Sequence, residues 1–371
     1  MKTKISLAIA TVLLAGTVSA APTFYGEVDV SLDYLPENNN GSSDRDVVEL
    51  SSNNSFIGIK GEEKLNDRLS ALYQSEWTIY VDDGVNGADP FVPRNQVLGL
   101  KDAKLGTLKV GKIDTPVKQL SSFVDSFNNS VENTADVAGL FSGENRIDNV
   151  VVYESPSFNV AEGQLRANLL LATGEAGGIA TSKGGAKVAG RGLGDALSTS
   201  VVFDNKIVVV GLGYDAAIPS NFLRKGYLNA SQTETNVSGV FAAANNIRAI
   251  GRLNLDNGLS LRALYQNAEV EDKAGNAAAA ATIDDENAWL IGAEYKIPTA
   301  KNWTVRGQYS QTATSFNTTR SDVELSQLIV GADYAFTKQF KAYGHAGYLT
   351  LEEGSAKDSQ VLVGTGLEFK F

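Results

Sequence analysis

The strongest constraint on the fold is an alternation of apolar and polar side chains with period two, which runs from residue 23 to the C-terminus. A period of two places successive side chains on opposite faces of a β-strand. In the first stretch, one set of alternate positions is mostly apolar: Phe24, Gly26, Val28, Val30, Leu32 and Tyr34. The other set is largely polar: Tyr25, Glu27, Asp29, Ser31 and Asp33. The same pattern recurs as far as residues 361–371, so we predict an all-β chain.

The connections between these stretches alternate between short and long. Short links are expected at residues 64–67, 101–104, 156–162, 204–205, 256–258, 298–301 and 337–338. Longer polar segments are expected at residues 35–53, 81–94, 113–147, 173–195, 216–244, 271–286, 314–321 and 352–358. A sandwich in water has no reason to segregate its loops by length, whereas a membrane barrel with short turns at one end does. We therefore predict a transmembrane antiparallel β-barrel of about 16 strands, with aromatic girdles near the strand ends.

Residues 1–20 have the features of a signal peptide. Lys2 and Lys4 precede a mostly apolar run, residues 5–18, and Val18-Ser19-Ala20 supplies the small residues of a cleavage site. A membrane anchor is the other interpretation, but the run is shorter than the roughly 20 residues that a spanning helix needs. We expect a signal peptide at residues 1–20 and one mature barrel domain at residues 21–371.

Composition narrows the range of functions. The chain has no cysteine, which excludes a disulfide scaffold and thiolate chemistry. It has 32 basic and 43 acidic residues, and loss of Lys2 and Lys4 with the signal peptide leaves a net charge of −13. This charge argues against nucleic acid as a partner. A barrel of about 16 strands encloses an aqueous channel, which explains how inward positions can hold charged side chains.

A series of short motifs follows the order and spacing found in one family. The motifs are Phe24-Tyr25-Gly26-Glu27-Val28-Asp29, Ile57-Gly58-Ile59-Lys60-Gly61-Glu62-Glu63, Leu98-Gly99-Leu100-Lys101, Gly106-Thr107-Leu108-Lys109-Val110-Gly111-Lys112, Thr115-Pro116, Arg146-Ile147-Asp148-Asn149, Tyr153-Glu154-Ser155-Pro156, Gly331-Ala332-Asp333-Tyr334 and Phe371. Each motif alone is weak. Together, along the whole mature chain, they resemble the general porins of the Gram-negative outer membrane, and the trimeric neisserial and burkholderial type more than the enterobacterial one.

The resemblance implies a homotrimer of diffusion channels for small hydrophilic solutes and ions in the bacterial outer membrane. Its partners would be membrane lipid, lipopolysaccharide and the barrel insertion machinery, and neither a cofactor nor a metal is implied. Outward residues that are small or apolar on the first and last strands suit a trimer contact: Gly26, Val28, Val361, Val363 and Thr365. The third outer loop would fold inward as a constriction carrying five acids: Asp114, Asp125, Glu132, Asp136 and Glu144.

Porins of this type oppose such acids with basic residues on the barrel wall, and this sequence departs from that pattern. The second strand has Phe56 where an arginine is common, and the corresponding basic position of the first strand is Glu27. Basic positions that do match are Lys60, Lys112 and Arg146. Further arginines with inward parity lie on later strands: Arg166, Arg248, Arg252, Arg262 and Arg306.

Two predictions about selectivity follow from these charges. The five loop acids, together with Glu27, Asp29 and Asp33 of the first strand, favour a mild cation preference at low salt that fades as salt rises. The alternative is a substrate-specific channel, because the later arginines could select anionic small molecules. The acidic segment 82–89 has the composition of a calcium loop, but it lacks the alternating ligand spacing and the distal glutamate.

An enzyme is the remaining class, because outer-membrane phospholipases are also barrels. His345 is the single histidine of the chain. A serine–histidine pair needs a third group that orients the histidine, and His345 lies in a predicted strand without a matching motif. We therefore expect no enzyme and interpret His345 as a lumen or interface residue.

The C-terminal residue generates a first testable prediction. Phe371 shares a face with Phe369, Leu367 and Val363, and the set resembles the signal that the barrel insertion machinery reads. Burial of one aromatic ring contributes about 3 kcal/mol at most, so a large effect must come from recognition. Deletion of Phe371 should leave the protein in the periplasm when cell fractions are compared. Insertion of the truncated chain at the normal rate and level would contradict this role.

Overall fold

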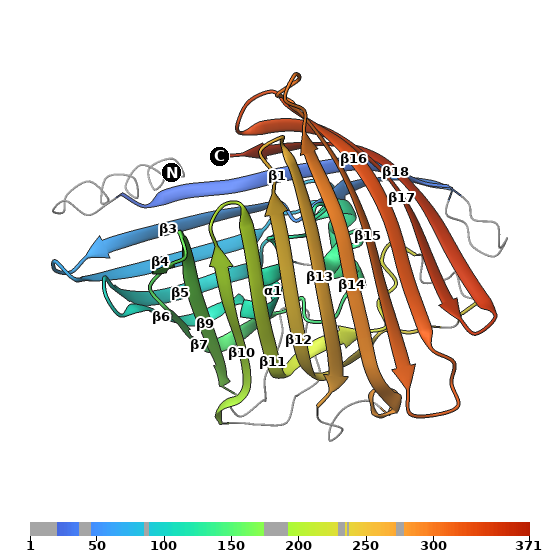
Figure 1. Cartoon of the computed structure of the whole chain (residues 1–371), viewed down its shortest axis with the longest axis horizontal. Helices are drawn as coiled ribbons and strands as arrows, with labels where there is room; N and C mark the ends of the chain where they lie inside the picture. Colours follow the sequence, from blue (N-terminus) through green and yellow to red (C-terminus); the bar gives the residue numbers. More distant parts are fainter. Residues whose placement is uncertain are drawn as a thin grey trace, which may run out of the picture.

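The computed structural model describes residues 21–36, 46–84, 89–173, 192–228, 234–235, 237–271 and 278–371. The predicted signal peptide, residues 1–20, lies outside the described residues. Strands account for most of what is described, and they form one antiparallel sheet that closes on itself (Figure 1). Among the described residues, no helix is long and apolar enough to span a bilayer.

The first half of the wall contains nine strand segments. They are β1 (Thr23–Leu35), β2 (Val47–Ser52), β3 (Phe56–Lys64), β4 (Leu69–Thr78), β5 (Val92–Asp102), β6 (Gly106–Asp114), β7 (Arg146–Glu154), β8 (Phe158–Val160) and β9 (Gly163–Thr173). The second half contains β10 (Leu193–Asp204), β11 (Val208–Phe222), β12 (Val240–Asn254), β13 (Leu259–Val270), β14 (Ile283–Lys296), β15 (Trp303–Phe316), β16 (Val323–Ala335), β17 (Phe340–Glu353) and β18 (Ala356–Lys370).

These segments occupy 16 positions in the wall, because two strands are interrupted. β2 and β3 both pair with β1, on either side of a break at residues 53–55. β7 and β8 both pair with β9, on either side of a break at residues 155–157. β1 pairs with β18 over eight residue pairs, from Glu27↔Lys370 to Tyr34↔Val363, which closes the barrel. The predicted antiparallel barrel of about 16 strands is therefore confirmed.

The alternation along the strands has the predicted orientation. On β1, Leu32 is 51% exposed whereas the next residue, Asp33, is fully buried. Aromatic rings contact one another in series around the turn end of the wall, from β15 to β1: Trp303, Tyr334, Phe336, Phe340, Phe369, Phe371 and Phe24. Such a belt of amphipathic and aromatic side chains is typical of the boundary between lipid and water.

The connections follow the predicted order, but strands extend into several segments that were expected to be loops or links, as β2 does within 35–53 and β8 within 156–162. Residues 352–358 were expected to form a longer loop, but β17 and β18 are joined by a two-residue turn, Gly354-Ser355. Gly354 has φ +61°, which a glycine adopts without the steric cost of a side chain. The expected loop 216–244 is also shorter, because β11 continues to Phe222 and β12 begins at Val240.

The long connection between β6 and β7, residues 115–145, lies inside the barrel and contains three short helices. They are α1 (Pro116–Ser121), α2 (Ser130–Asn133) and α3 (Val137–Leu140), and a further 3₁₀ turn, η2 (Ala280–Thr282), precedes β14. Thr115 caps α1 through its side chain and Pro116 starts the helix, a combination favoured at helix N-termini. α1 contacts β10, β11 and β12, and α3 contacts β15.

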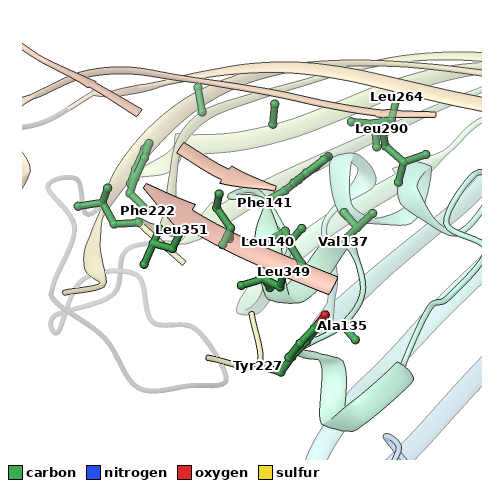
Figure 2. Packing of buried hydrophobic residues seen from close by; sticks show 14 of the residues in the cluster. Ala135, Val137, Leu140, Phe141, Phe222, Tyr227, Leu264, Leu290, Leu349 and Leu351 are labelled. Carbon is green, nitrogen blue, oxygen red and sulfur yellow. The ribbon is translucent and has the colours of Figure 1, made fainter. Parts of the chain in front are cut away.

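This inner loop is attached by a hydrophobic core inside the barrel. Val137, Leu140 and Phe141 of the loop belong to one buried cluster with inward side chains of the wall such as Leu290 and Leu349. Figure 2 shows these side chains, with Leu264 and Leu351 of the wall among them. Burial of each side chain of this size contributes about 1.5–3 kcal/mol to the free energy that stabilises the folded loop. The sequence predicted polar side chains on the inner face, and these are thus found where the loop does not cover the wall.

Candidate functional site

The inner loop crosses the lumen and is bonded to the wall on both sides. At its start, the Val117 backbone N–H donates to Ser198 Oγ of β10 at 3.3 Å. At its tip, the Asn54 amide donates to Asn129 Oδ1 at 2.9 Å, and the Glu132 backbone N–H donates to Asn53 Oδ1 at 3.0 Å. Residues 53 and 54 lie in the break between β2 and β3. The loop therefore spans the lumen from β9 and β10 to the break between β2 and β3.

The central anchor of the loop is a buried ion pair between Arg248 of β12 and Glu144. Arg248 is fully buried, and its guanidinium also donates to the backbone oxygens of Val117 at 3.1 Å and Ser142 at 3.0 Å. Glu144 accepts a second bond, from Ser121 Oγ at 3.2 Å. Because one cation binds both ends of the loop, Arg248 has a structural position and does not face the lumen, contrary to the sequence-based expectation.

Asp125 and Asp136 hold the turns of the loop. Asp125 accepts from the backbone N–H groups of Phe127 and Val137, each at 3.0 Å, and from Gln308 Nε2 at 3.1 Å. Asp136 caps α3 by accepting from the Gly139 N–H at 3.0 Å, and it accepts from the Asn129 N–H at 2.8 Å. Burial, together with the neighbouring Asp125 carboxylate, raises the pKa of Asp136 to about 8. Neither carboxylate faces the lumen.

The two remaining loop acids differ from each other. Asp114 lies between two cations, with Lys118 Nζ at 2.8 Å and Arg146 Nη2 at 3.0 Å. Glu132 is exposed on the loop rim, near Asp82, Asp83 and Glu49. Partial withdrawal from water, and then the Asp82 carboxylate, raise the pKa of Glu132 to about 7. The expectation that five loop acids face the lumen is therefore corrected: it holds for Glu132 alone, because the other four make the contacts that fold the loop.

Three arginines lie on the inner wall toward the short turns, and two of them, Arg252 and Arg306, bond to the loop. Arg252 Nη1 donates to the Phe123 backbone oxygen at 3.2 Å, and Arg306 Nη1 donates to the Ser126 backbone oxygen at 2.6 Å. Arg306 also forms an ion pair with Asp333 at 2.9 Å, and Arg262 forms one with Glu294. These three arginines have the predicted inward parity, but the carboxylates of Glu294 and Asp333 offset two of the charges.

The acidic face of β1 is compensated in the same way. Lys370 Nζ lies 3.4 Å from Glu27 and 3.0 Å from Glu368, and Lys341 Nζ lies 2.7 Å from Glu368. Carboxylate oxygens of Glu27, Asp29 and Glu368 are close enough to one another for a metal ion. With two ammonium groups already in contact, the charge of this cluster does not require a metal.

His345 is buried beside Asp33, with Nε2 3.0 Å from Oδ1. Ser31 donates to the other oxygen of Asp33, at 2.5 Å. The carboxylate thus lies between serine and histidine, whereas nucleophilic catalysis needs the histidine between the serine and the acid. The arrangement holds β1 and β17 together and lacks the order of a catalytic triad.

The remaining predicted wall residues divide between the two faces. Phe56 and Lys60 of β3 face the lumen, and Arg166 is exposed on the inward face of β9. Lys112 does not face the lumen. On β4, Gln74 and Glu76 face inward, because both bond to Tyr25. Ser75 lies between them and therefore faces outward. Ser75 pairs in register with Gln96, and Gln96 pairs with Lys112, so all three share the outer face. Lys112 has the same parity as Leu108 and Val110, which are exposed on the outer face, so alternation along β6 also places it outward.

Arg94 of β5 is a lumen residue that the sequence analysis missed. Its guanidinium stacks on Phe56, 4.7 Å from the ring centroid, and donates to Asn54 Oδ1. The alternation that would have identified it is broken by a register shift between β4 and β5. Arg94 thus brings a cation beside the ring that stands at the expected arginine position.

A second inward loop was also missed, between β11 and β12. The Gly226 backbone N–H donates to Gly139 O of the inner loop at 3.2 Å, and Tyr227, Leu228 and Val237 belong to the buried cluster (Figure 2). Farther along this connection, Thr235 Oγ1 donates to Asp358 of β18 at 2.7 Å. Apolar residues within a predicted polar loop were the available signal.

A closed antiparallel wall of 16 positions, with an inner loop that leaves part of a charged inner face uncovered, defines a β-barrel channel of the outer-membrane type. Comparison with known proteins supports the same class. The model of the Gram-negative porin family matches residues 6–354. The chain belongs to the Gram-negative porins, and its location is the bacterial outer membrane.

Individual relatives are distant in sequence. The chain is similar to the major outer membrane protein P.IB of Neisseria sicca, with 25% identity over 97% of this chain and 99% of the relative. Among solved structures it is similar to the anion-selective porin from Comamonas acidovorans, with a TM-score of 0.68, 19% identity and coverage of 95% and 99% of the two chains. It is also similar to the trimer form of OmpT of Vibrio cholerae, with a TM-score of 0.63, 18% identity and the same coverage. At these identities the structures support the fold alone.

The buried anchor of the inner loop generates the second prediction. Arg248→Met leaves Glu144 buried without its cation, which costs about 3–5 kcal/mol, so the loop should detach and trypsin should cleave at Lys118. Arg248→Met combined with Glu144→Met should restore part of the resistance, because no unpaired charge remains. Arg320→Met is the matched control, because it breaks the more exposed ion pair with Glu353. Loss of that pair should lower the stability by about 1 kcal/mol or less. Equal cleavage of Arg248→Met and Arg320→Met would refute the anchor.

Proposed function

We propose that the protein is a diffusion porin that lets small hydrophilic solutes and ions cross the outer membrane through a water-filled channel. One observation carries this proposal: charged side chains on the inner face of the closed barrel are exposed to solvent. Lys60 of β3, Lys101 of β5 and Arg166 of β9 are examples. Ammonium and guanidinium groups remain charged in such a place because water reaches them. The exposed inner wall and the rim of the inner loop would then bound the conducting opening.

The contacts of the loop acids change the selectivity that we propose. Cation preference was expected because five acids were to face the lumen, but four of them bind the loop. Within the described part of the chain, the recorded ion pairs do not include Lys60, Arg166 or Arg252. The narrow part is thus more basic than the net charge suggests, while Glu132, Glu49, Asp82 and Asp83 make the outer rim acidic. We propose a weak preference for anions at low salt, which keeps the anionic-solute alternative open.

We propose no enzymatic activity for this barrel. The family consists of channels, and the order of Ser31, Asp33 and His345 does not fit a hydrolase. We also propose that residues 1–20 direct export and that the insertion machinery, lipid and lipopolysaccharide are partners of the mature barrel, as the family membership and the outward apolar band suggest.

A homotrimer is the proposed assembly. β18 and β1 present Val361, Val363 and Val28 outward, and these are small side chains that allow close approach. On nearby strands, Ser75, Gln96 and Lys112 form an outward polar row. Polar side chains are costly against lipid, so a neighbouring protomer that covers this row would remove the cost.

Conductance measurements in planar bilayers test the channel and its selectivity, and this is the third prediction. The wild type should form stable open channels in KCl, with a reversal potential that indicates weak anion preference in a salt gradient. The pKa of Glu132 is raised to about 7, so the carboxylate is charged above pH 7 and neutral below it. Anion preference should therefore increase as pH falls from 8 to 6. Glu132→Gln should have the low-pH preference at every pH. Cation preference at pH 6, or a pH response that survives in Glu132→Gln, would refute the assignment.

Native mass spectrometry of detergent-extracted protein tests the assembly, and this is the fourth prediction. The wild type should have the mass of three chains. Val363→Arg should yield monomers, because an arginine cannot be buried at a small-residue contact. Ile291→Arg places the same charge on the outward face of β14, away from β1 and β18, and should remain trimeric at the same cost against lipid, about 2–4 kcal/mol near the bilayer centre. A wild-type monomer in all mild detergents would exclude the trimer.

A further inference from the structure

The inner face of β3 carries a continuous column of aromatic and cationic groups. Inward positions on this strand are Phe56, Gly58 and Lys60. The Tyr25 ring of β1 lies against Gly58, where an added Cβ would be 2.8 Å from Tyr25 Cζ. Glycine at this position therefore allows the ring to lie on the wall between Phe56 and Lys60. At about 3.3 Å per residue, the column from residue 56 to residue 60 extends about 13 Å along the strand.

Contacts between neighbouring groups hold this column together. Tyr25 and Phe56 meet edge to face with ring centroids 6.0 Å apart, and Lys60 Nζ lies 4.4 Å from the Tyr25 centroid. Arg94 completes the other end, with its guanidinium 4.7 Å from the Phe56 centroid. The Tyr25 hydroxyl donates to Glu76 Oε1 at 2.7 Å and accepts from Gln74 Nε2 at 2.9 Å. Both rings are thus held in fixed positions between two cations.

The column begins at the constriction and continues toward the end of the barrel that carries the short turns. Arg94 binds Asn54, and Asn54 binds Asn129 at the tip of the inner loop. From there the chain direction of β3 leads through Phe56 and the Tyr25 ring to Lys60, which is exposed. A solute that passes the loop tip therefore meets this column next.

Within the described residues, neither cation of the column has a carboxylate in close contact, although Asp114, Glu76 and Glu27 act on Arg94 from a distance. The nearest recorded carboxylate to Arg94 is Glu76, with Nε 4.0 Å from Oε2, which is at the limit for an ion pair. Elsewhere on the described wall, Lys101, Lys109, Arg262 and Arg306 have carboxylates in contact. The Arg94 side chain is 12% exposed, and its Nε is buried without a hydrogen-bond partner, so a solute reaches the guanidinium at its exposed edge. A guanidinium stacked on a ring keeps its donor edge available for a carboxylate.

We propose that the Arg94–Phe56–Tyr25–Lys60 column is a binding site for aromatic carboxylates on the channel wall. The carboxylate of the solute pairs with Arg94 or Lys60, and its ring packs on Phe56 or Tyr25. Such a site raises the local concentration of the solute at the narrow part of the channel and favours its passage over that of equally small neutral or aliphatic solutes. The inference rests on the proposed channel function, because the solute must reach the inner wall.

The fifth prediction tests this site with sodium benzoate as the probe. Single-channel current in KCl is recorded while benzoate, acetate or benzyl alcohol is added. Benzoate should interrupt the current in a concentration-dependent manner and bind more tightly than acetate, which lacks a ring, and benzyl alcohol, which lacks the charge. Phe56→Leu keeps an apolar side chain but removes the ring, and it should weaken benzoate binding about two- to fivefold. Arg94→Gln and Lys60→Gln should weaken it at least as much.

Lys101→Gln is the matched control, since this lysine lies on the same inner wall but is paired with Glu62, and it should leave benzoate binding unchanged. KCl conductance of each variant shows that the barrel has folded. Because Lys60 is exposed, Lys60→Gln leaves the packing of the wall intact. If benzoate binds the wild type no better than acetate, or if variants with normal conductance bind benzoate like the wild type, the site is refuted and the channel stands. A wild type without KCl conductance would refute the channel itself.

Discussion

Every part of this structure depends on the requirement that backbone polar groups in lipid find partners within the sheet. The pairing of β1 with β18 meets it by removing the two edges that an open sheet would expose. The C-terminal residue completes the seam, with backbone bonds in both directions between Gly26 and Phe371 at 3.0 and 3.1 Å. Gly26 has room for no side chain there, because an added Cβ would be 2.6 Å from the Phe371 ring. Closure then separates an outer face for lipid from an inner face for water.

Inside the closed wall, the structure resembles a soluble protein on one side and a channel on the other. The inner loop and the connection between β11 and β12 bury a hydrophobic cluster against β10 to β18. Arg248 and Glu144 lie within this packed region, where an unpaired charge would be costly and a paired one selects a single loop position. Toward the short turns of β3 to β9, Lys60, Lys101 and Arg166 are exposed to water. The boundary between the packed region and the exposed inner wall determines where a solute can pass.

The electric field in the lumen depends on which charged side chains have a partner of opposite charge, more than on how many charged side chains there are. Arg262, Arg306 and Lys341 each contact a carboxylate, so they contribute little field to the open channel. Lys60 and Arg94 rest on aromatic rings instead, which leave their charge available. A net charge of −13 for the mature chain therefore says little about the narrow part of the pore. In the proposed channel, a solute would meet an acidic outer rim and then a more basic constriction.

The sequence by itself determined the class of fold, the number of wall positions, the face of each regular strand and the family, because period-two alternation and loop length are local properties of the chain. Its alternation also predicts the inner face for Phe56, Lys60, Arg252 and Arg306. It missed Arg94, because the register shift between β4 and β5 beside this residue breaks the alternation and depends on pairing between strands. Lys112 was expected in the lumen from the family resemblance, whereas its alternation with Leu108 and Val110 places it outward. Only the tertiary structure decided that Asp125, Asp136 and Glu144 bind the loop itself. Whether a carboxylate faces water or a backbone N–H depends on contacts between residues far apart in the chain, and alternation along one strand carries no information about them.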